Sequence, residues 1–131
     1  METKDIRQEV FFKAKPKEVY DALMDSKTHA KFTDSPAKIG KKEGDKFSAF
    51  DGYATGENLT LKEGKLIVQT WRASDWPEGY YSKISFEFTG EKNGTKLVFK
   101  QTGIPKDKVK DIGKGWEDYY WTPMKSMFDK K

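Results

Sequence analysis

The chain has 131 residues, which suits one domain, and we expect a single domain over residues 1–131. It has no cysteine, which excludes disulfides, zinc–thiolate sites and thiol catalysis. Its 25 Lys and Arg and 21 Asp and Glu are spread along the chain, so the net charge of +4 lacks the clustered basic stripe of a nucleic-acid binder. The charged start METKDIRQEV is unlike a signal peptide and no run is long enough to span a membrane, so we expect a cytoplasmic protein that binds neither nucleic acid nor membrane.

The first part of the chain predicts one strand and two short helices. Apolar residues alternate over Ile6–Phe12, which indicates a strand. Pro16 fits the first position of a helix whose apolar stripe lies within Val19–Leu23. Asp25-Ser26 can cap a second short helix that runs through Phe32.

Residues 45–103 predict a meander of antiparallel strands. Turn signals separate its apolar runs, namely Asp51-Gly52, Lys62-Glu63-Gly64-Lys65, Pro77-Glu78-Gly79 and Asn93-Gly94. In the run Leu66–Ala73, alternation places Ile67, Gln69 and Trp71 on one face of a strand. Arg72 then points to the opposite face.

The end of the chain predicts an amphipathic helix of about four turns. Its apolar residues recur at helical spacing, namely Trp116, Tyr120, Met124 and Met127 or Phe128. Pro123 is expected to kink or split this helix near Tyr119, because proline removes a backbone hydrogen bond. An antiparallel sheet whose inner face is covered by helices belongs to the α+β class.

Short motifs, in a fixed order, resemble one known family. They are Phe12-Lys13-Ala14 with Glu18-Val19-Tyr20-Asp21-Ala22-Leu23, Gly44-Asp45-Lys46-Phe47-Ser48-Ala49-Phe50-Asp51-Gly52, Gly56-Glu57, Ile67-Val68-Gln69-Thr70-Trp71-Arg72, Trp76-Pro77-Glu78-Gly79, Gln101-Thr102-Gly103-Ile104-Pro105 and Gly115-Trp116 with Tyr120. Their order and spacing resemble the activator of 90-kDa heat-shock protein ATPase homologue-like family, of the START-like superfamily. The resemblance implies a helix-grip fold, in which a curved antiparallel sheet wraps around a long C-terminal helix and two short helices follow the first strand.

The resemblance also implies a function. It is to the C-terminal domain of a eukaryotic stress-response co-chaperone, so we expect a non-enzymatic domain that binds the 90-kDa heat-shock chaperone and modulates its ATPase. These residues leave no room for the co-chaperone's N-terminal domain, so strong stimulation is not expected from them alone. Phe32 stands where the family often has tryptophan, which is a conservative aromatic change.

Side chains that face inward in a START-like fold line a pocket between the sheet and the terminal helix. The candidates are Phe47, Trp71, Ile84, Phe86, Phe99, Trp116, Tyr120 and Met124. Simple core packing is the alternative for each of them, and so many bulky rings favour a small cavity. Arg72, Trp76 and Glu78 are the candidates for partner contact, because an exposed tryptophan beside charge is typical of binding hot spots.

Two alternative functions would use the same pocket. One is a START-like carrier or sensor of a small hydrophobic ligand, and the other is a START-like cyclase or hydrolase. A buried carboxylate beside Tyr80 or Tyr120 would favour the enzyme. His29, the single histidine, lacks partners at metal-ligand spacing and is expected to be solvated on the second helix. We predict no catalytic residue, metal or cofactor.

Overall fold

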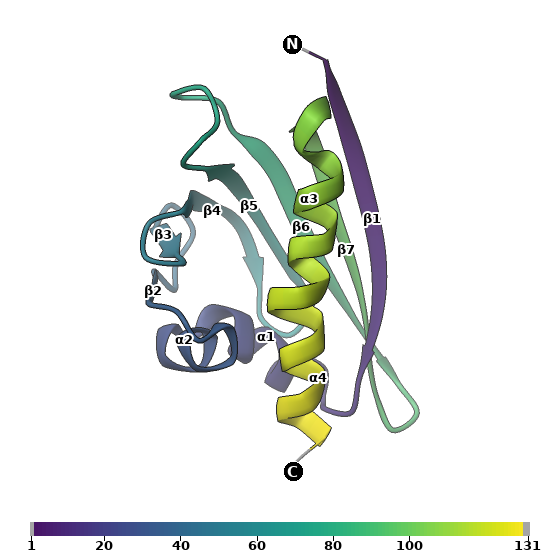
Figure 1. Ribbon diagram of the computed structural model, residues 1–131. Coiled ribbons are helices and arrows are strands. Elements are labelled where there is room, and N and C mark those ends of the chain that lie inside the picture. Colours follow the sequence, from purple (N-terminus) through teal and green to yellow (C-terminus); the bar gives the residue numbers. More distant parts are fainter. Residues whose placement is uncertain (1, 130–131) are drawn as a thin grey trace.

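A computed structural model describes residues 2–129 as a curved antiparallel sheet with one long helix lying across it (Figure 1). The strands are β1 (Thr3–Phe12), β2 (Ala37–Ile39), β3 (Lys46–Ala49), β4 (Ala54–Lys62), β5 (Leu66–Ala73), β6 (Ser82–Glu91) and β7 (Gly94–Pro105). They lie in the order β1-β7-β6-β5-β4-β3-β2, so β1 and β2 form the edges. This arrangement confirms the predicted α+β helix-grip fold.

Two short helices, α1 (Pro16–Met24) and α2 (Ser26–Thr33), follow β1 and lie together at one end of the sheet (Figure 1). Pro16 opens α1, and the Lys15 N–H donates a hydrogen bond to Glu18 Oε1 at 3.2 Å. Asp25 caps α2, because its Oδ2 atom accepts hydrogen bonds from the Thr28 N–H and hydroxyl at 3.0 and 2.7 Å. Both helix starts agree with the sequence prediction.

The meander follows the predicted turns, with one additional strand. In β5 the inward side chains Ile67, Gln69 and Trp71 are buried, while Arg72 lies on the outer face. Strand β2, which pairs only with β3, was not predicted. A strand of three residues is too short to show a readable alternation, so only its pairing with β3 defines it.

The terminal helix is continuous but changes its pitch midway. It follows a short 3-10 turn, η1 (Lys106–Lys108), and comprises α3 (Val109–Trp116), a π-helical turn η2 (Glu117–Trp121) and α4 (Thr122–Asp129). In the π turn the Thr122 N–H bonds to the Glu117 carbonyl. Pro123 has no N–H for the Tyr119 carbonyl, and we attribute the wider turn before it to this missing donor. The predicted disturbance near Tyr119 is therefore a widened turn and not a split.

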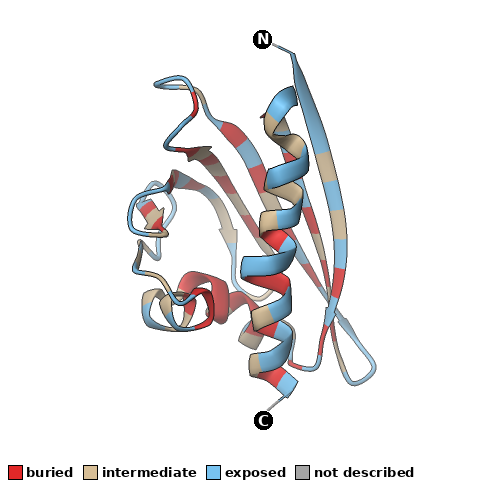
Figure 2. Ribbon diagram, in the orientation of Figure 1, coloured by how far each residue is buried: buried red, intermediate tan, exposed pale blue. Residues whose placement is uncertain are grey.

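The extra residue of the π turn changes which rings face the sheet. Tyr120 and Trp121 are consecutive and both buried, although the helical spacing indicated only Tyr120. Trp121 Nε1 donates to Gln8 Oε1 at 2.7 Å, and Gln8 Nε2 donates to the Gly113 carbonyl at 3.1 Å. Buried residues line the face of the helix toward the sheet, while its outer face is exposed (Figure 2). Gln8 therefore ties β1 to two turns of the helix.

Candidate functional site

The space between sheet and helix is filled by aromatic rings. All eight predicted cavity-lining residues are buried there: Phe47, Trp71, Ile84, Phe86, Phe99, Trp116, Tyr120 and Met124. The ring centroids of Phe99 and Trp116 lie 4.4 Å apart, as do those of Trp116 and Tyr120. Among residues 2–129, the void between these rings measures about 20 Å³, which is room for about one water molecule. Small-molecule sites measure roughly 300 Å³ or more, so this interior has no room for an enclosed ligand.

A chain of buried hydrogen bonds joins the helix to the sheet beside this void. Trp116 Nε1 donates to Gln101 Oε1 at 2.8 Å, and Gln101 Nε2 donates to the Ser82 hydroxyl at 2.9 Å. Ser82 in turn donates to the carbonyl of Trp71 at 2.8 Å. Because each buried polar group has a partner, the network fixes the helix position without an unpaired group among these atoms.

His29 lies midway along α2 and is buried, with 4% of its surface exposed. The prediction that it is solvated is wrong. Its Nε2 atom forms a 2.9 Å hydrogen bond with the Tyr120 hydroxyl, and its ring also packs on Phe32. Lys27 and Lys31 surround it in sequence but lie on other faces of the helix, since successive residues are about 100° apart.

Burial controls the ionisation of this pair. It lowers the pKa of His29 to about 4, so the imidazole is neutral at pH 7. Burial also raises the pKa of the Tyr120 hydroxyl well above its usual range. The His29 Nδ1 atom has no hydrogen-bond partner within residues 2–129. We conclude that the pair serves helix docking in its neutral form.

The corner between β5 and β6 is organised around Trp76. The expectation that Trp76 is exposed is wrong, because only 4% of it is exposed. Its ring packs edge-on against Trp71 at 5.3 Å and against Tyr80 at 5.9 Å. A tryptophan at a turn is buried here because the corner folds back over the end of the core.

The other two partner-contact candidates lie on the surface of this corner. Arg72 Nη2 donates to the Trp76 carbonyl at 2.7 Å and to the Pro77 carbonyl at 3.3 Å. Its side chain therefore braces the corner from the outer face of β5. Glu78 is exposed at the tip. Of the three candidates, only Glu78 is exposed, since Arg72 is half-buried and Trp76 is buried.

Outside the packed interior lies an open groove of about 430 Å³ between the β3–β4 hairpin and the terminal helix. We call it the aromatic groove, and it is lined by Phe50, Tyr53, Trp71, Asp111, Ile112, Gly115, Trp116, Tyr119 and Tyr120. Tyr119 is 58% exposed and Tyr53 is 42% exposed, so two of its rings face solvent. Phe50 packs edge-on against Tyr119 at 5.7 Å and Tyr120 at 5.8 Å.

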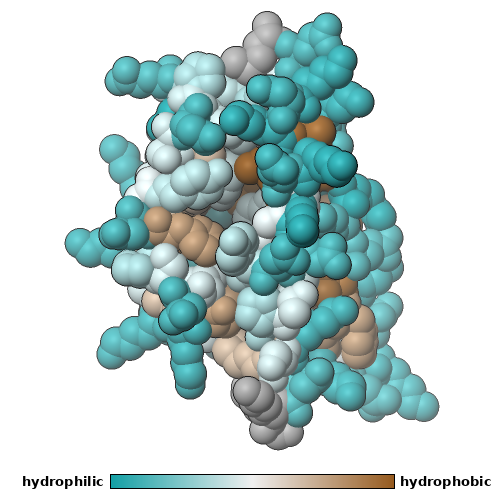
Figure 3. Space-filling model, in the orientation of Figure 1, coloured by the Kyte–Doolittle hydropathy of each residue, from teal (hydrophilic) through white to brown (hydrophobic). Residues whose placement is uncertain are grey.

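Sequence reasoning missed Phe50, Tyr53 and Tyr119 as site residues. The Asp51-Gly52 turn signal places the first two at a hairpin tip, but no local pattern indicates that this tip lies against the helix. In the face shown in Figure 3, tan and brown side chains form small patches among hydrophilic ones.

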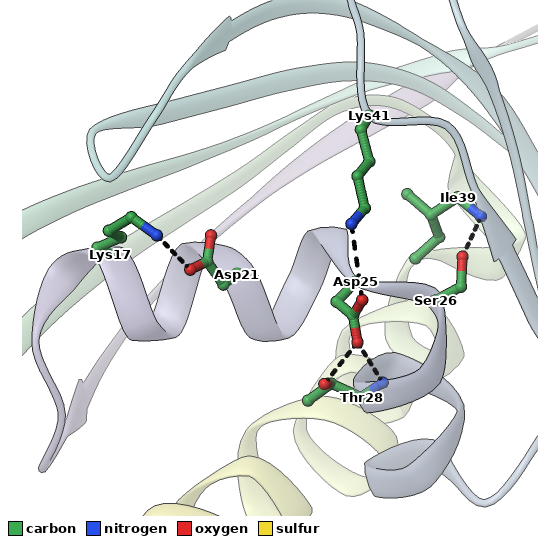
Figure 4. Close-up of polar contacts among 7 residues, drawn as sticks. All are labelled: Lys17, Asp21, Asp25, Ser26, Thr28, Ile39 and Lys41. Carbon is green, nitrogen blue, oxygen red and sulfur yellow. Dashed lines mark hydrogen bonds and ion pairs between the residues drawn. The ribbon is translucent and has the colours of Figure 1, made fainter.

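A second, charged groove of about 940 Å³ lies among α1, α2, the β4–β5 turn and α4. Figure 4 shows part of its rim, where Lys17 pairs with Asp21 at 2.8 Å and Lys41 lies 3.8 Å from Asp25. Hydrogen bonds from Thr28, with Lys41 and Lys27 adding attraction, lower the pKa of Asp25. Both ion pairs are solvent-exposed, so they contribute little stability and remain available to a polar partner.

The acidic residues offer no buried catalytic carboxylate. None of the 21 Asp and Glu, all of which lie within residues 2–129, is buried. Over the same range no three His, Asp or Glu side chains gather to hold a metal ion, and no helix is long and apolar enough to cross a bilayer. The buried titratable group beside Tyr120 is the imidazole of His29. It is not the carboxylate that would favour an enzyme.

Comparisons with known proteins agree with the fold. The family described as "Activator of Hsp90 ATPase homolog 1-like protein" matches residues 13–129. The human activator of 90 kDa heat shock protein ATPase homolog 1 is 32% identical over 117 residues, which cover 89% of this chain and 35% of the human protein. A Dictyostelium discoideum homolog of that activator is 34% identical over 116 residues, covering 88% of this chain and 30% of the relative.

The chain belongs to the activator of Hsp90 ATPase homolog 1-like family. A crystal structure of an HSP90 activator from Plasmodium falciparum has the same fold, with a TM-score of 0.84 and 27% identity over 95% of this chain and 94% of that one. The chain spans about a third of the length of the human and Dictyostelium relatives.

The tryptophan-containing motifs, by which the chain resembles this family, pack together in the structure. The tryptophans of Trp71-Arg72, Trp76-Pro77-Glu78-Gly79 and Gly115-Trp116 are all buried in one cluster. Trp71 contacts both of the others, with centroids 5.3 Å from Trp76 and 6.0 Å from Trp116. These motifs therefore mark the packing that joins the β5–β6 corner to the terminal helix.

Proposed function

We propose that this chain binds a 90-kDa heat-shock chaperone and modulates its ATP hydrolysis. The observation that carries the proposal is the similarity to the human activator, which extends over 117 residues and 89% of this chain. The proposal concerns the part of the relatives that this chain matches, so we expect modest stimulation from the chain alone.

The filled interior supports a function exerted at the surface. A void of about 20 Å³ leaves the protein without an enclosed ligand to deliver, which counts against the carrier hypothesis. Contact with a partner then uses exposed side chains. A rigid frame beneath them favours binding, because rigid surfaces lose less entropy when a complex forms.

We propose the β5–β6 corner as one contact surface. Trp76 is anchored in the core below it and Arg72 braces it by two hydrogen bonds, so the tip is held in one geometry. Glu78 is exposed there and presents negative charge, while the exposed Asp75 pairs with Lys108 at 3.4 Å. In this proposal Trp76 supports the contact surface from within, and Glu78 meets the partner.

The experiment mixes the protein with the 90-kDa chaperone of its source organism and measures complex formation by calorimetry and ATP turnover by phosphate release. Charge reversal by Glu78→Lys is expected to weaken binding about two- to fivefold, as is usual for an exposed ionic contact. Glu91→Lys is the matched control, because Glu91 is also exposed but lies at the opposite end of β6. Absence of both a complex and any change in ATP turnover would contradict the proposed function.

A further inference from the structure

The aromatic groove has the size and the lining of a small-molecule site. Its volume of about 430 Å³ lies within the range of roughly 300–1,000 Å³ that such sites occupy. Trp71 and Trp116 lie at its buried side, while Phe50, Tyr53 and Tyr119 form its walls. Unlike the interior, this space is open to solvent and needs no rearrangement to be entered.

Gly115, on the terminal helix, leaves room for the aromatic groove. Asp111, Gly115 and Tyr119 follow one another at four-residue steps, so they share a strip of the helix surface. A methyl group added at Gly115 would have no neighbour nearer than Tyr119 Cδ2 at 3.9 Å. The space between Asp111 and Tyr119 is therefore empty because the middle residue has no side chain.

The charge at the groove is negative. Asp111 is the only charged residue in its lining, and its carboxylate forms no hydrogen bond or ion pair within residues 2–129. The nearby cation Lys108 is already paired with Asp75 at 3.4 Å. Burial raises the pKa of the Tyr53 hydroxyl, and Asp75 and Asp111 also raise it while Lys108 acts in the opposite direction, so the net shift is upward and this wall remains a neutral phenol. Among the described residues the lining contains no cation, and the nearby Lys108 is shared with Asp75, so an anion would meet no unpaired positive charge here.

The hairpin that supplies Phe50 is held in a strained conformation. Phe50 has φ 54° and Asp51 has φ 55°, in the left-handed region that non-glycine residues seldom adopt. The Asp51 N–H is fixed by the Pro36 carbonyl at 3.1 Å. In this conformation the Phe50 ring packs on Tyr119 and Tyr120 of the helix, where it closes one side of the groove.

We propose that the aromatic groove binds a small organic cation, with its apolar body against Phe50, Tyr53 and Tyr119 and its ammonium group beside Asp111. Aromatic faces attract cations through their quadrupole, and an adjacent carboxylate adds a Coulombic attraction. This combination of rings and one unpaired acid favours a cation over a neutral or anionic molecule of the same shape. The inference goes beyond the proposed chaperone function and does not depend on it.

The test compares three probes of matched shape, without any chaperone present. They are naphthylmethyl-trimethylammonium, the neutral naphthalenemethanol and the anionic naphthylacetate. Binding is measured by calorimetry and by NMR shifts of the indole N–H groups of Trp71 and Trp116, which lie at the groove. We expect saturable binding of the cation, with the neutral probe about threefold weaker and the anion weaker still.

Variants then separate the contributions that the Asp111 charge, the Tyr119 ring and the open space at Gly115 make to binding. Asp111→Asn keeps the shape and is expected to weaken the cation about threefold while leaving the neutral probe unchanged. Gly115→Leu is expected to abolish binding of both the cation and the neutral probe, because its side chain fills the groove. Leucine is a good helix former, so the fold should be retained. Tyr119→Ala is expected to weaken the cation about threefold, whereas Tyr81→Ala, at an exposed tyrosine outside the groove, has no effect.

The proposal is overturned if the three probes bind equally, if no probe saturates up to millimolar concentration, or if Gly115→Leu binds the cation as the unmodified chain does. The NMR spectrum of each variant verifies its fold independently of binding. Because no chaperone is present, failure here leaves the proposed function unaffected, and failure of chaperone binding leaves this site unaffected.

Discussion

Tyr119 and Tyr120 are adjacent in sequence and belong to two different regions of the molecule. Tyr120 is 6% exposed, hydrogen-bonded to His29 and in contact with the rings of the helix–sheet interface. Tyr119 is 58% exposed and packs only on Phe50 at the aromatic groove. The two tyrosines show that the interface buries its rings, which stabilises the fold, while the groove leaves a ring exposed, as the proposed cation site requires.

The largest expected effect is at the interface. Trp116→Ala removes a buried ring that contacts Trp71, Phe99 and Tyr120 and leaves Gln101 without its donor. We expect the free energy of unfolding to fall by about 4 kcal/mol, as for other buried aromatic truncations. Denaturant unfolding followed by circular dichroism measures it.

Tyr119→Ala is the matched control, on the same helix but at the groove. It is expected to change the free energy of unfolding by less than about 1 kcal/mol, because most of the ring is already in water. Equal losses for the two variants would contradict the division of the helix into an interface and a recognition face.

The second effect is a pH dependence that originates at the interface. Burial lowers the pKa of His29 from 6.5 to about 4, so the unfolded chain binds a proton that the folded chain does not in this interval. Stability is therefore expected to fall as pH falls from about 6.5 to about 4, by about 3 kcal/mol in all. Urea unfolding at half-unit pH steps gives the curve.

His29→Gln provides the comparison for that curve. Glutamine does not titrate, so the fall between pH 6.5 and 4 should be absent, although the variant starts from a lower stability because the bond to Tyr120 changes. Losses from Asp25, whose pKa is lowered by its hydrogen bonds to Thr28, occur below this interval. A pH curve identical in both proteins would show that His29 is not the source.

The smallest effect is expected at the groove and has the opposite sign. Gly115→Ala adds a methyl group into ordinary contact distance, 3.9 Å from Tyr119, at a helical position. Replacing glycine by alanine within a helix should raise the free energy of unfolding by roughly 0.5–1 kcal/mol. A loss of stability, seen as a lower thermal midpoint, would mean that Gly115 is packed and not at an open groove.

Local signals predicted much of the fold. Pro16 and Asp25 mark the two helix starts, and the Asn93-Gly94 turn joins β6 to β7 with Asn93 at φ 70°. The burial of Trp71 follows from alternation along β5. These features depend on residues close in sequence, so periodicity and capping chemistry reveal them.

The candidate sites were harder to predict, because they depend on contacts between distant segments. Trp76 is buried by Trp71 and Tyr80, and His29 by Tyr120, which lies 91 residues away. The π turn before Pro123 moved Trp121 onto the buried face, which a regular helical repeat does not anticipate. Pro123 indicates a disturbance of this helix but not which ring it buries, and the residues that flank Trp76 and His29 give no sign of their burial.

The amino-acid sequence alone therefore determined most of the elements and their order, apart from β2 and the second buried ring of the terminal helix, because turns, caps and apolar periodicity act within a few residues. The tertiary structure decided which aromatic side chains fill the interior and which remain at an open groove. Which rings are buried depends on how the β3–β4 hairpin contacts the terminal helix. This contact is determined by close packing in three dimensions and not by local conformational preference.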